Sequence, residues 1–303
     1  MNSSNPTPLI TILGPTASGK TRLAVAVAQQ LNGEILSADS RQVYRGMDIG
    51  TGKDLEEYGQ TPYHLIDICE AGERYNIYQF QLDFWAAYEQ IHTRGHQAIM
   101  CGGSGLYLDA VLKGYNLTAI PINPTRRAEL LPLSTDTLRD IFLQKNSPFA
   151  AKTDLASHKR LIRAIEIAEY AANHTVDFQN FQPINSLIFG IDLPRDLRRE
   201  RIATRLHKRL DAGLIEEVET LLTQGVSPET LVYYGLEYKF VIEYLQQKQS
   251  KAYLTEHLTI AIQQFAKRQM TYFRKMERDG LHIHWIDGQL PLAEQLEQIT
   301  RQT

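Results

Sequence analysis

Short apolar runs alternate with longer amphipathic segments along most of the chain. The runs with the length of buried strands are residues 9–13, 34–37, 64–68, 97–101 and 187–192. The intervening segments are long enough for crossover helices, beginning with the Ala/Val/Leu-rich residues 22–31. This alternation predicts a parallel sheet covered by helices on both faces, and the run 282–286 is expected to add its last strand.

The pattern changes between about residues 121 and 183. Prolines and asparagines open this stretch, and a helical pattern then runs from Arg160 to Ala168 without a clear strand. We therefore expect a mostly helical insertion that interrupts the α/β core. The predicted parts are residues 1–120 (first part of the core), 121–185 (insertion) and 186–303 (rest of the core, with C-terminal helices).

Composition narrows the class of protein. The 303 residues are 43% hydrophobic and 22% charged, which excludes collagenous, disulfide-stapled and disordered chains. Two cysteines cannot form a disulfide framework, and no signal peptide or run of about 18 apolar residues is present, so we expect a cytoplasmic protein without a membrane partner. A net charge of -3, taken alone, argues against a nucleic-acid partner.

A phosphate-binding loop follows the first predicted strand and opens the first helix. Residues 14–21 match the pattern G-x-x-x-x-G-K-[ST] in full, which favours a P-loop NTPase-like fold. Backbone N–H groups and the helix N-terminus would hold phosphate oxygens, Lys20 would reach one of them, and Thr21 would ligate Mg²⁺. The predicted phosphate-binding residues are Gly14, Pro15, Thr16, Ala17, Ser18, Gly19, Lys20 and Thr21. Kinases, NTPases and other pyrophosphate users share this loop, so the reaction type stays open here.

Two further loops are predicted at the same edge of the sheet. Asp39 and Ser40 follow the second strand, where a carboxylate can accept a proton from a nucleophile. Ser104 lies in the glycine-rich segment CGGSGLY after the fourth run, whose glycines are expected to permit close approach of a ligand. A second acidic residue for Mg²⁺ has three candidates, which position alone does not separate: Asp39, Asp67 and Asp192.

Six segments together resemble the tRNA dimethylallyltransferases, also called tRNA isopentenyltransferases. They are GPTASGKT (14–21), ADS to VYRGMDIGT (38–51), PYHLIDI (62–68), CGGSGLY (101–107), KRLIRAIEI (159–167) and FAKRQMTYFR (265–274). Their order and spacing match that family from about residue 9 to 287. Ser104 departs from the usual threonine and Gln263 from the usual arginine, and Ala156-Ser157-His158 stands where an asparagine is usual.

The resemblance implies transfer of a dimethylallyl group from dimethylallyl diphosphate to N6 of adenosine 37, next to the tRNA anticodon, with release of diphosphate. It implies Asp39 as general base, catalytic roles for Ser104 and Lys20, Mg²⁺ as cofactor, and binding of the anticodon arm. We expect a monomer, although the sequence itself does not reveal the oligomeric state. Besides the loop, it implies Arg201 and Arg205 at the diphosphate. The residues that it implies at the tRNA are Asp39, Ser40, Arg41, Gln42, Arg127, Lys159, Arg160, Arg163, Tyr234, Gly235, Lys267, Arg268 and Gln269.

Positive charge is gathered in three segments, 158–163, 195–209 and 263–278. Arg198, Arg201, Arg205 and Arg209 recur at helical spacing on one face, which is typical of phosphate contacts or of a solvated face. A near-neutral total therefore predicts one basic face and an affinity for tRNA that falls steeply with salt. Phe265 and Phe273 are expected in the core.

Three alternatives carry different expectations. An adenylate isopentenyltransferase acts on free AMP, ADP or ATP. It needs neither the helix that carries AKRQ (266–269) nor the basic cluster at 158–163, and both are present. A P-loop kinase or NTPase would use the insertion as a lid. A non-catalytic RNA-binding module is disfavoured by the intact Lys20, Thr21 and Asp39.

Overall fold

The computed structural model describes residues 8–115, 120–147, 153–174 and 181–303. They form two compact units, one within residues 1–115 and 182–303 and the other within residues 116–181. Each unit has its own apolar core. None of the helices in these described ranges is long and apolar enough to cross a membrane.

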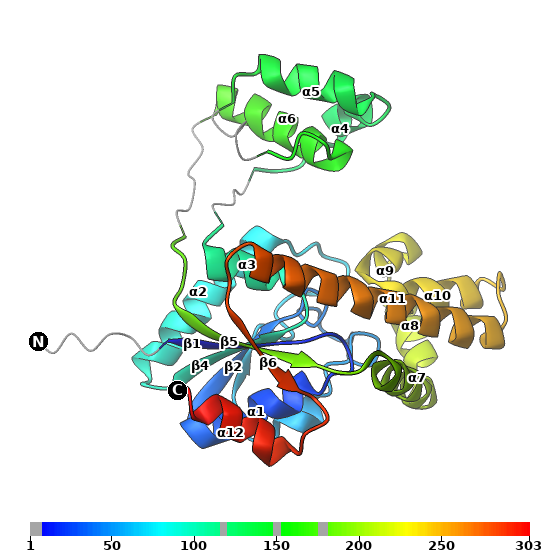
Figure 1. Cartoon of the computed structure of the whole chain (residues 1–303). Helices are drawn as coiled ribbons and strands as arrows, with labels where there is room; N and C mark the ends of the chain where they lie inside the picture. The colour runs from blue at the N-terminus through cyan, green and yellow to red at the C-terminus, as the bar shows by residue number, and fades with distance from the viewer. Residues whose placement is uncertain (1–7, 116–119, 148–152, 175–180) are drawn as a thin grey trace, which may run out of the picture. The chain divides into compact units, whose positions relative to one another are not determined.

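A parallel sheet forms the centre of the larger unit (Figure 1). Within the described residues its strand order is β3-β2-β4-β1-β5-β6, and all neighbours run parallel. The strands are β1 (Leu9–Leu13), β2 (Gly33–Ala38), β3 (Tyr63–His64), β4 (Gln97–Gly102), β5 (Ser186–Asp192) and β6 (Ile283–Asp287). The predicted parallel sheet is confirmed, including the last strand beside β5.

Helices cover both faces of this sheet (Figure 1). Successive strand residues point to opposite faces, so Ile10 and Ile12 pack in one core and Leu9 and Leu13 in the other. The first face carries α1 (Lys20–Leu31) and α12 (Leu292–Thr300). The second carries α2 (Ile77–Thr93), α3 (Gly105–Lys113) and α11 (Lys251–Arg278). The remaining elements of this unit are η1 (Leu55–Tyr58), α7 (Arg195–Asp211), α8 (Leu214–Thr223), α9 (Pro228–Tyr234) and α10 (Leu236–Leu245).

The predicted strand over residues 64–68 is wrong beyond His64. Leu65 and Asp67 have left-handed backbones, with φ of 66° and 57°, which end the extended conformation. Asp67 instead turns its carboxylate to the buried ammonium of Lys53. The apolar run therefore packs as a loop against the core rather than lengthening the edge strand.

The smaller unit consists of α4 (Pro124–Leu130), α5 (Thr135–Gln144) and α6 (His158–Asn173) among its described residues. Their apolar faces meet in a small core that includes Leu130, Phe142 and Ile165. Parts of the predicted insertion, residues 148–152 and 175–180, lie outside the described residues. The contact of this unit with tRNA stays a prediction.

A buried carboxylate anchors the amino-terminal edge of the sheet. Glu34 accepts hydrogen bonds from Nε and Nη2 of Arg94, both at 2.7 Å, and both its oxygens lie 2.6 Å from ring nitrogens of His64 and His96. The Arg94 guanidinium is the main cause that lowers the pKa of Glu34 to about 2, against the effect of burial.

Replacement of Glu34 by glutamine should therefore destabilise the protein by about 3 kcal/mol at neutral pH. Because the folded pKa lies below the ordinary value, the contribution of Glu34 is complete above about pH 4.5 and is lost as the pH falls toward 2. Urea unfolding of wild type and Glu34→Gln, compared from pH 7 downward, measures this. A difference that stays constant below pH 4.5 contradicts the assignment.

Candidate active site

The phosphate loop lies between β1 and α1, as predicted. Gly19 and Ala17 have left-handed backbones, which curl the loop so that its N–H groups turn inward. The Thr16 N–H donates to Oε1 of Gln269 at 2.9 Å. The buried Ser18 hydroxyl has no partner among the described residues, and it lines the cavity in front of the loop. A buried hydroxyl with an unused donor at a helix N-terminus fits an anionic ligand.

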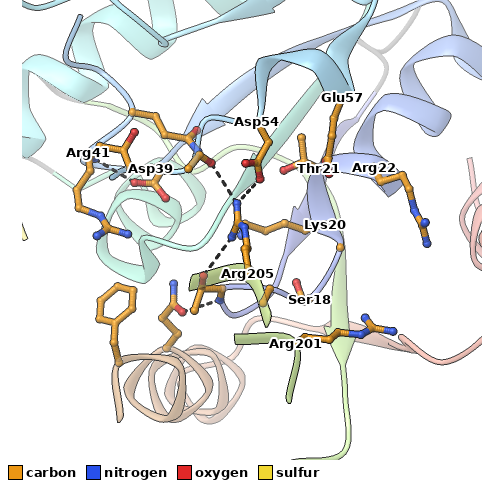
Figure 2. Close-up of a pocket in the computed structure, with 18 of the residues that line it drawn as sticks. Ser18, Lys20, Thr21, Arg22, Asp39, Arg41, Asp54, Glu57, Arg201 and Arg205 are labelled. Carbon is orange, nitrogen blue, oxygen red and sulfur yellow. Dashed lines mark hydrogen bonds and ion pairs between the residues drawn. The ribbon is translucent and has the colours of Figure 1, made fainter. Parts of the chain in front are cut away.

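This cavity, which residues 16–21 line, has a volume of about 450 Å³. We call it the donor cavity, after the prenyl donor whose diphosphate the loop is expected to bind. Figure 2 shows Lys20 and Arg205 projecting toward its middle, with Arg22 and Arg201 at its edge. Its cationic lining residues are Lys20, Arg22, Arg41, Arg201, Arg205 and Lys208. Burial lowers the pKa of the Lys20 ammonium, so a bound anion would relieve an electrostatic cost. Residues 16–21 of the predicted phosphate-binding loop thus line this cavity with Arg201 and Arg205, whereas Gly14 and Pro15 do not line it.

The predicted arginine stripe of α7 does not act as one surface. The Arg205 guanidinium donates to Asp54 and to the carbonyl oxygen of Gly52, inside the donor cavity. Arg209 is instead buried against Glu237, with 3.4 Å between Nη1 and Oε1, and burial lowers its pKa to about 10. Arg198 lines a different depression. The four arginines share one helical spacing, but their side chains lie in three different environments.

Two acids of the donor cavity were not predicted from the sequence. Asp54 and Glu57 line it together with Asp39, and η1 brings them there by packing against α1. No motif marks these residues, because their position depends on the fold of residues 46–58. Asp54 pairs with Arg205, and burial raises the pKa of Glu57.

The oxygen groups of the donor cavity fit Mg²⁺. The Thr21 hydroxyl and the carboxylates of Asp39, Asp54 and Glu57 all line it, and Mg²⁺ commonly uses one or two such oxygens with phosphate oxygens and water. In the described part of the chain, no cluster of three or more His, Cys, Asp or Glu could hold a metal without such help. Of the other predicted acids, Asp67 pairs with Lys53 and Asp192 lines a separate depression.

Asp39 and Ser104 meet at the carboxyl edge of the sheet, as predicted. The Arg41 N–H donates to Oδ1 of Asp39 at 3.0 Å, which fixes one carboxylate oxygen. The Ser40 N–H donates to Oγ of Ser104 at 3.0 Å, and the Ser104 hydroxyl donates to Oγ of Ser40 at 3.3 Å. Ser104 therefore holds the loop that carries Asp39.

A second, smaller cavity of about 220 Å³ adjoins the donor cavity. The residues common to both linings are Thr16, Asp39, Arg41 and Phe265. The lining specific to the second cavity includes Ser104, Leu236 and Ile262. Asp39 thus faces a cationic space on one side and a more apolar space on the other.

The prediction that Phe265 belongs to the core is wrong, whereas Phe273 is fully buried. The Phe265 ring lies at the cavities with the guanidinium of Arg41 5.6 Å and that of Arg268 5.8 Å from its centroid. The Phe265 ring thus makes cation–π contacts with both guanidinium groups and lines the same cavities as Asp39.

The expectation that the CGGSG glycines admit a ligand is also wrong. A Cβ at Gly102 would lie 2.2 Å from the carbonyl oxygen of Ala38, and one at Gly105 would lie 2.4 Å from the ring of Tyr272. These glycines let β2 and α11 approach closely. The glycines thus serve the packing of this segment against β2 and α11, which positions Ser104.

Several predicted tRNA residues make internal contacts. The Gln269 amide bridges the phosphate loop to the Gly103 carbonyl oxygen, which it reaches at 2.9 Å. The buried Tyr234 hydroxyl donates to the Glu73 carbonyl oxygen. Arg41 forms an ion pair with Glu237 at 2.6 Å and packs against Gly235, while the Gln42 amide donates to the Gly52 carbonyl oxygen. Lys267 and Arg268 are exposed on α11.

In the smaller unit, Arg127 and Arg163 both pair with the buried carboxylate of Glu166. Arg163 also donates to the Ile120 carbonyl oxygen. Lys159 and Arg160 are exposed, and Arg160 pairs with Asp154. Two of the four predicted tRNA contacts therefore also hold this unit together.

Glu217 of α8 anchors the loop that carries Gly52 and Asp54. Its carboxylate accepts the N–H groups of Asp48 (2.8 Å), Ile49 (2.6 Å) and Gly50 (2.9 Å) and the Tyr238 hydroxyl (2.9 Å). Gly52 then lies so close to Arg209 that a Cβ would be 1.4 Å from Nη2. Position 52 therefore has no room for a side chain, and the Arg209 guanidinium packs directly against the backbone of the loop.

Replacement of Glu217 by alanine should destabilise the protein by about 3 kcal/mol, because three N–H donors lose a charged acceptor. It should also raise the KM for the ligand of the donor cavity. The exposed neighbour Glu216, changed to alanine, is the matched control and should alter neither. Urea unfolding and steady-state kinetics measure both effects, and equal stability of the two variants would refute the anchoring role.

Comparison with known proteins gives the family. A model described as IPP transferase matches residues 42–276, and one described as isopentenyl transferase matches residues 7–62. The chain is 55% identical to tRNA dimethylallyltransferase 2 of Porphyromonas gingivalis, over 97% of this chain and 98% of that protein. It is 54% identical to tRNA dimethylallyltransferase 1 of Parabacteroides distasonis, over 95% of each.

A solved structure agrees with this relationship. The tRNA isopentenylpyrophosphate transferase of Bacillus halodurans superposes with a TM-score of 0.72 at 32% identity, covering 97% of this chain and 94% of that chain. This likeness extends over both the P-loop core and the segment inserted in it. Given sequence matches that span nearly the whole chain, the protein belongs to the tRNA dimethylallyltransferase family, a family of isopentenyl transferases.

Proposed function

We propose that this protein transfers the dimethylallyl group of dimethylallyl diphosphate to N6 of adenosine 37 in tRNA and releases diphosphate. The observation that carries the proposal is the place of Asp39, which lines both the donor cavity and the adjoining smaller cavity. The donor's diphosphate fits the cationic side. The dimethylallyl carbon and the adenine amine would meet on the other side.

The transfer requires one bond to form and one to break. The N6 lone pair bonds to C1 of the dimethylallyl group while the C1–O bond breaks, and its electron pair leaves with diphosphate. The proton of N6 passes to the Asp39 carboxylate, which Arg41 N–H orients. Lys20 and Arg205 meet the charge that develops on the leaving group.

Mg²⁺ is part of this proposal. Thr21 would hold it together with a carboxylate of the donor cavity, and when bound it would supply positive charge to the diphosphate. The target adenine must leave the anticodon-loop stack to reach Asp39, and the Phe265 ring offers a face for it. The two buried free thiols, Cys69 and Cys101, suit a reducing compartment, and we propose the cytoplasm.

The choice of acceptor is tested by offering both candidates. The protein is incubated with dimethylallyl diphosphate, Mg²⁺ and either unmodified tRNA or AMP, and the adenine products are analysed by mass spectrometry. We expect prenylated adenosine in tRNA and unchanged AMP. Prenylated AMP with unmodified tRNA would overturn the tRNA assignment, and phosphoryl transfer from ATP without prenylation would favour a kinase.

A further inference from the structure

A second basic depression lies between α7 and α11, apart from the donor cavity. This α7–α11 groove has a volume of about 560 Å³. Its cationic lining residues are Arg195, Arg198, Arg199, Lys267 and Arg274. The remaining lining residues are apolar or neutral, and none is acidic or aromatic. The groove therefore offers positive charge and no ring on which a base could stack.

The cations of the groove have no ion-pair partner in the described part of the chain, although Asp192 and Asp287 line an adjoining depression with Arg195, Arg198 and Arg274. None of the five forms an ion pair within 4.0 Å among the described residues, whereas Arg205 and Arg209 on the same helix do. Burial lowers the pKa of Arg198, and the neighbouring Arg195, Arg274 and Arg199 lower it further, although Asp192 opposes this. Clustered like charges raise the energy of the free protein, and an anion in the groove removes that cost.

The two helices that form the groove also form the donor cavity. On α7, Arg201 and Arg205 face the donor cavity, while Arg198 and Arg199 face the groove. On α11, Phe265 and Gln269 face the cavities, while Lys267 and Arg274 face the groove. Lys267 and Arg274 are seven residues apart, which spans roughly 10 Å along the helix. The groove is thus separate from the donor cavity and shares no lining residue with it.

We propose that the α7–α11 groove binds backbone phosphates of the tRNA substrate. This inference rests on the proposed function and adds a contact surface to it. Arginine and lysine side chains bind backbone phosphates irrespective of sequence. The donor's diphosphate already has its own cavity, so a long polyanion is the ligand that uses both sides of α7.

The test removes three charges that have no place in the donor cavity. The variant Arg198→Gln/Arg199→Gln/Arg274→Gln is compared with Lys251→Gln, which removes an exposed charge at the far end of α11. Binding of unmodified tRNA is measured by fluorescence anisotropy between about 50 and 300 mM salt. We expect the triple variant to bind about tenfold or more weakly and its salt slope to fall by roughly 0.7–0.9 per lost phosphate contact.

A gain-of-charge variant tests the same surface in the other direction. Gln263 lines the groove, so Gln263→Arg should strengthen tRNA binding and steepen the salt slope by about one. The KM for dimethylallyl diphosphate should stay at the wild-type value in both variants. Wild-type affinity and slope in the triple variant would overturn the inference.

The failure of this inference can be told from failure of the proposed function. If wild-type protein prenylates tRNA and the triple variant binds tRNA as wild type does, the groove proposal alone is wrong. If wild-type protein neither binds nor prenylates tRNA, the proposed function is wrong. A triple variant that binds weakly but keeps the wild-type melting temperature supports the groove, because loss of folding is then not the cause.

Discussion

Replacement of Asp39 by asparagine is expected to lower kcat by about 10²–10⁴-fold, the range typical of a lost general base. Asparagine keeps the size of the side chain and still accepts the Arg41 N–H, so the loop should keep its position. Its amide cannot take the proton of N6, because it is not basic at neutral pH. Single-turnover formation of prenylated adenosine measures the chemical step directly.

The control for Asp39 is another carboxylate that follows a strand. Asp192 ends β5 and lines a depression outside the donor cavity, so Asp192→Asn should leave the chemical step near the wild-type rate. If Asp39→Asn kept the wild-type single-turnover rate while its affinity for tRNA fell, Asp39 would be a positioning residue only.

Replacement of Lys20 by methionine is expected to lower kcat by about 10²–10³-fold, as removal of a single stabilising donor does in other active sites. Methionine fills much of the same space, and Lys20 lies at the start of α1 inside the donor cavity. Lys20 belongs to the phosphate loop and lines the donor cavity, so the KM for dimethylallyl diphosphate should rise as well.

The matching control is Lys248→Met, which removes an exposed ammonium outside the cavities. Steady-state kinetics with dimethylallyl diphosphate as the varied substrate separate the two variants. Turnover of Lys20→Met within a few-fold of wild type would contradict the assigned role of Lys20.

The sequence pattern predicted the parallel sheet because β1, β2, β4 and β5 are largely buried and therefore mostly apolar on both faces. It failed at residues 64–68, where an equally apolar run takes left-handed turns at Leu65 and Asp67. Those turns depend on Lys53 and on packing against residues distant in sequence, which a local pattern does not record.

The candidate site was predictable where a motif fixes backbone geometry. Residues 14–21, Asp39 and Ser104 lie at the expected edge of the sheet because the ends of parallel strands bring them there. Asp54, Glu57 and the outward turn of Phe265 were not predictable, since each depends on how distant elements pack. The split of the α7 arginines into cavity, core and groove has the same cause.

The central claim is that the phosphate loop here serves the departure of diphosphate from carbon rather than transfer of a phosphoryl group. The most direct measurement counts diphosphate released and N6-prenylated adenosine formed in one reaction with tRNA and dimethylallyl diphosphate. We expect one diphosphate for each prenylated adenosine and no release of orthophosphate. Orthophosphate as the product, or diphosphate released without modified adenosine, would contradict it.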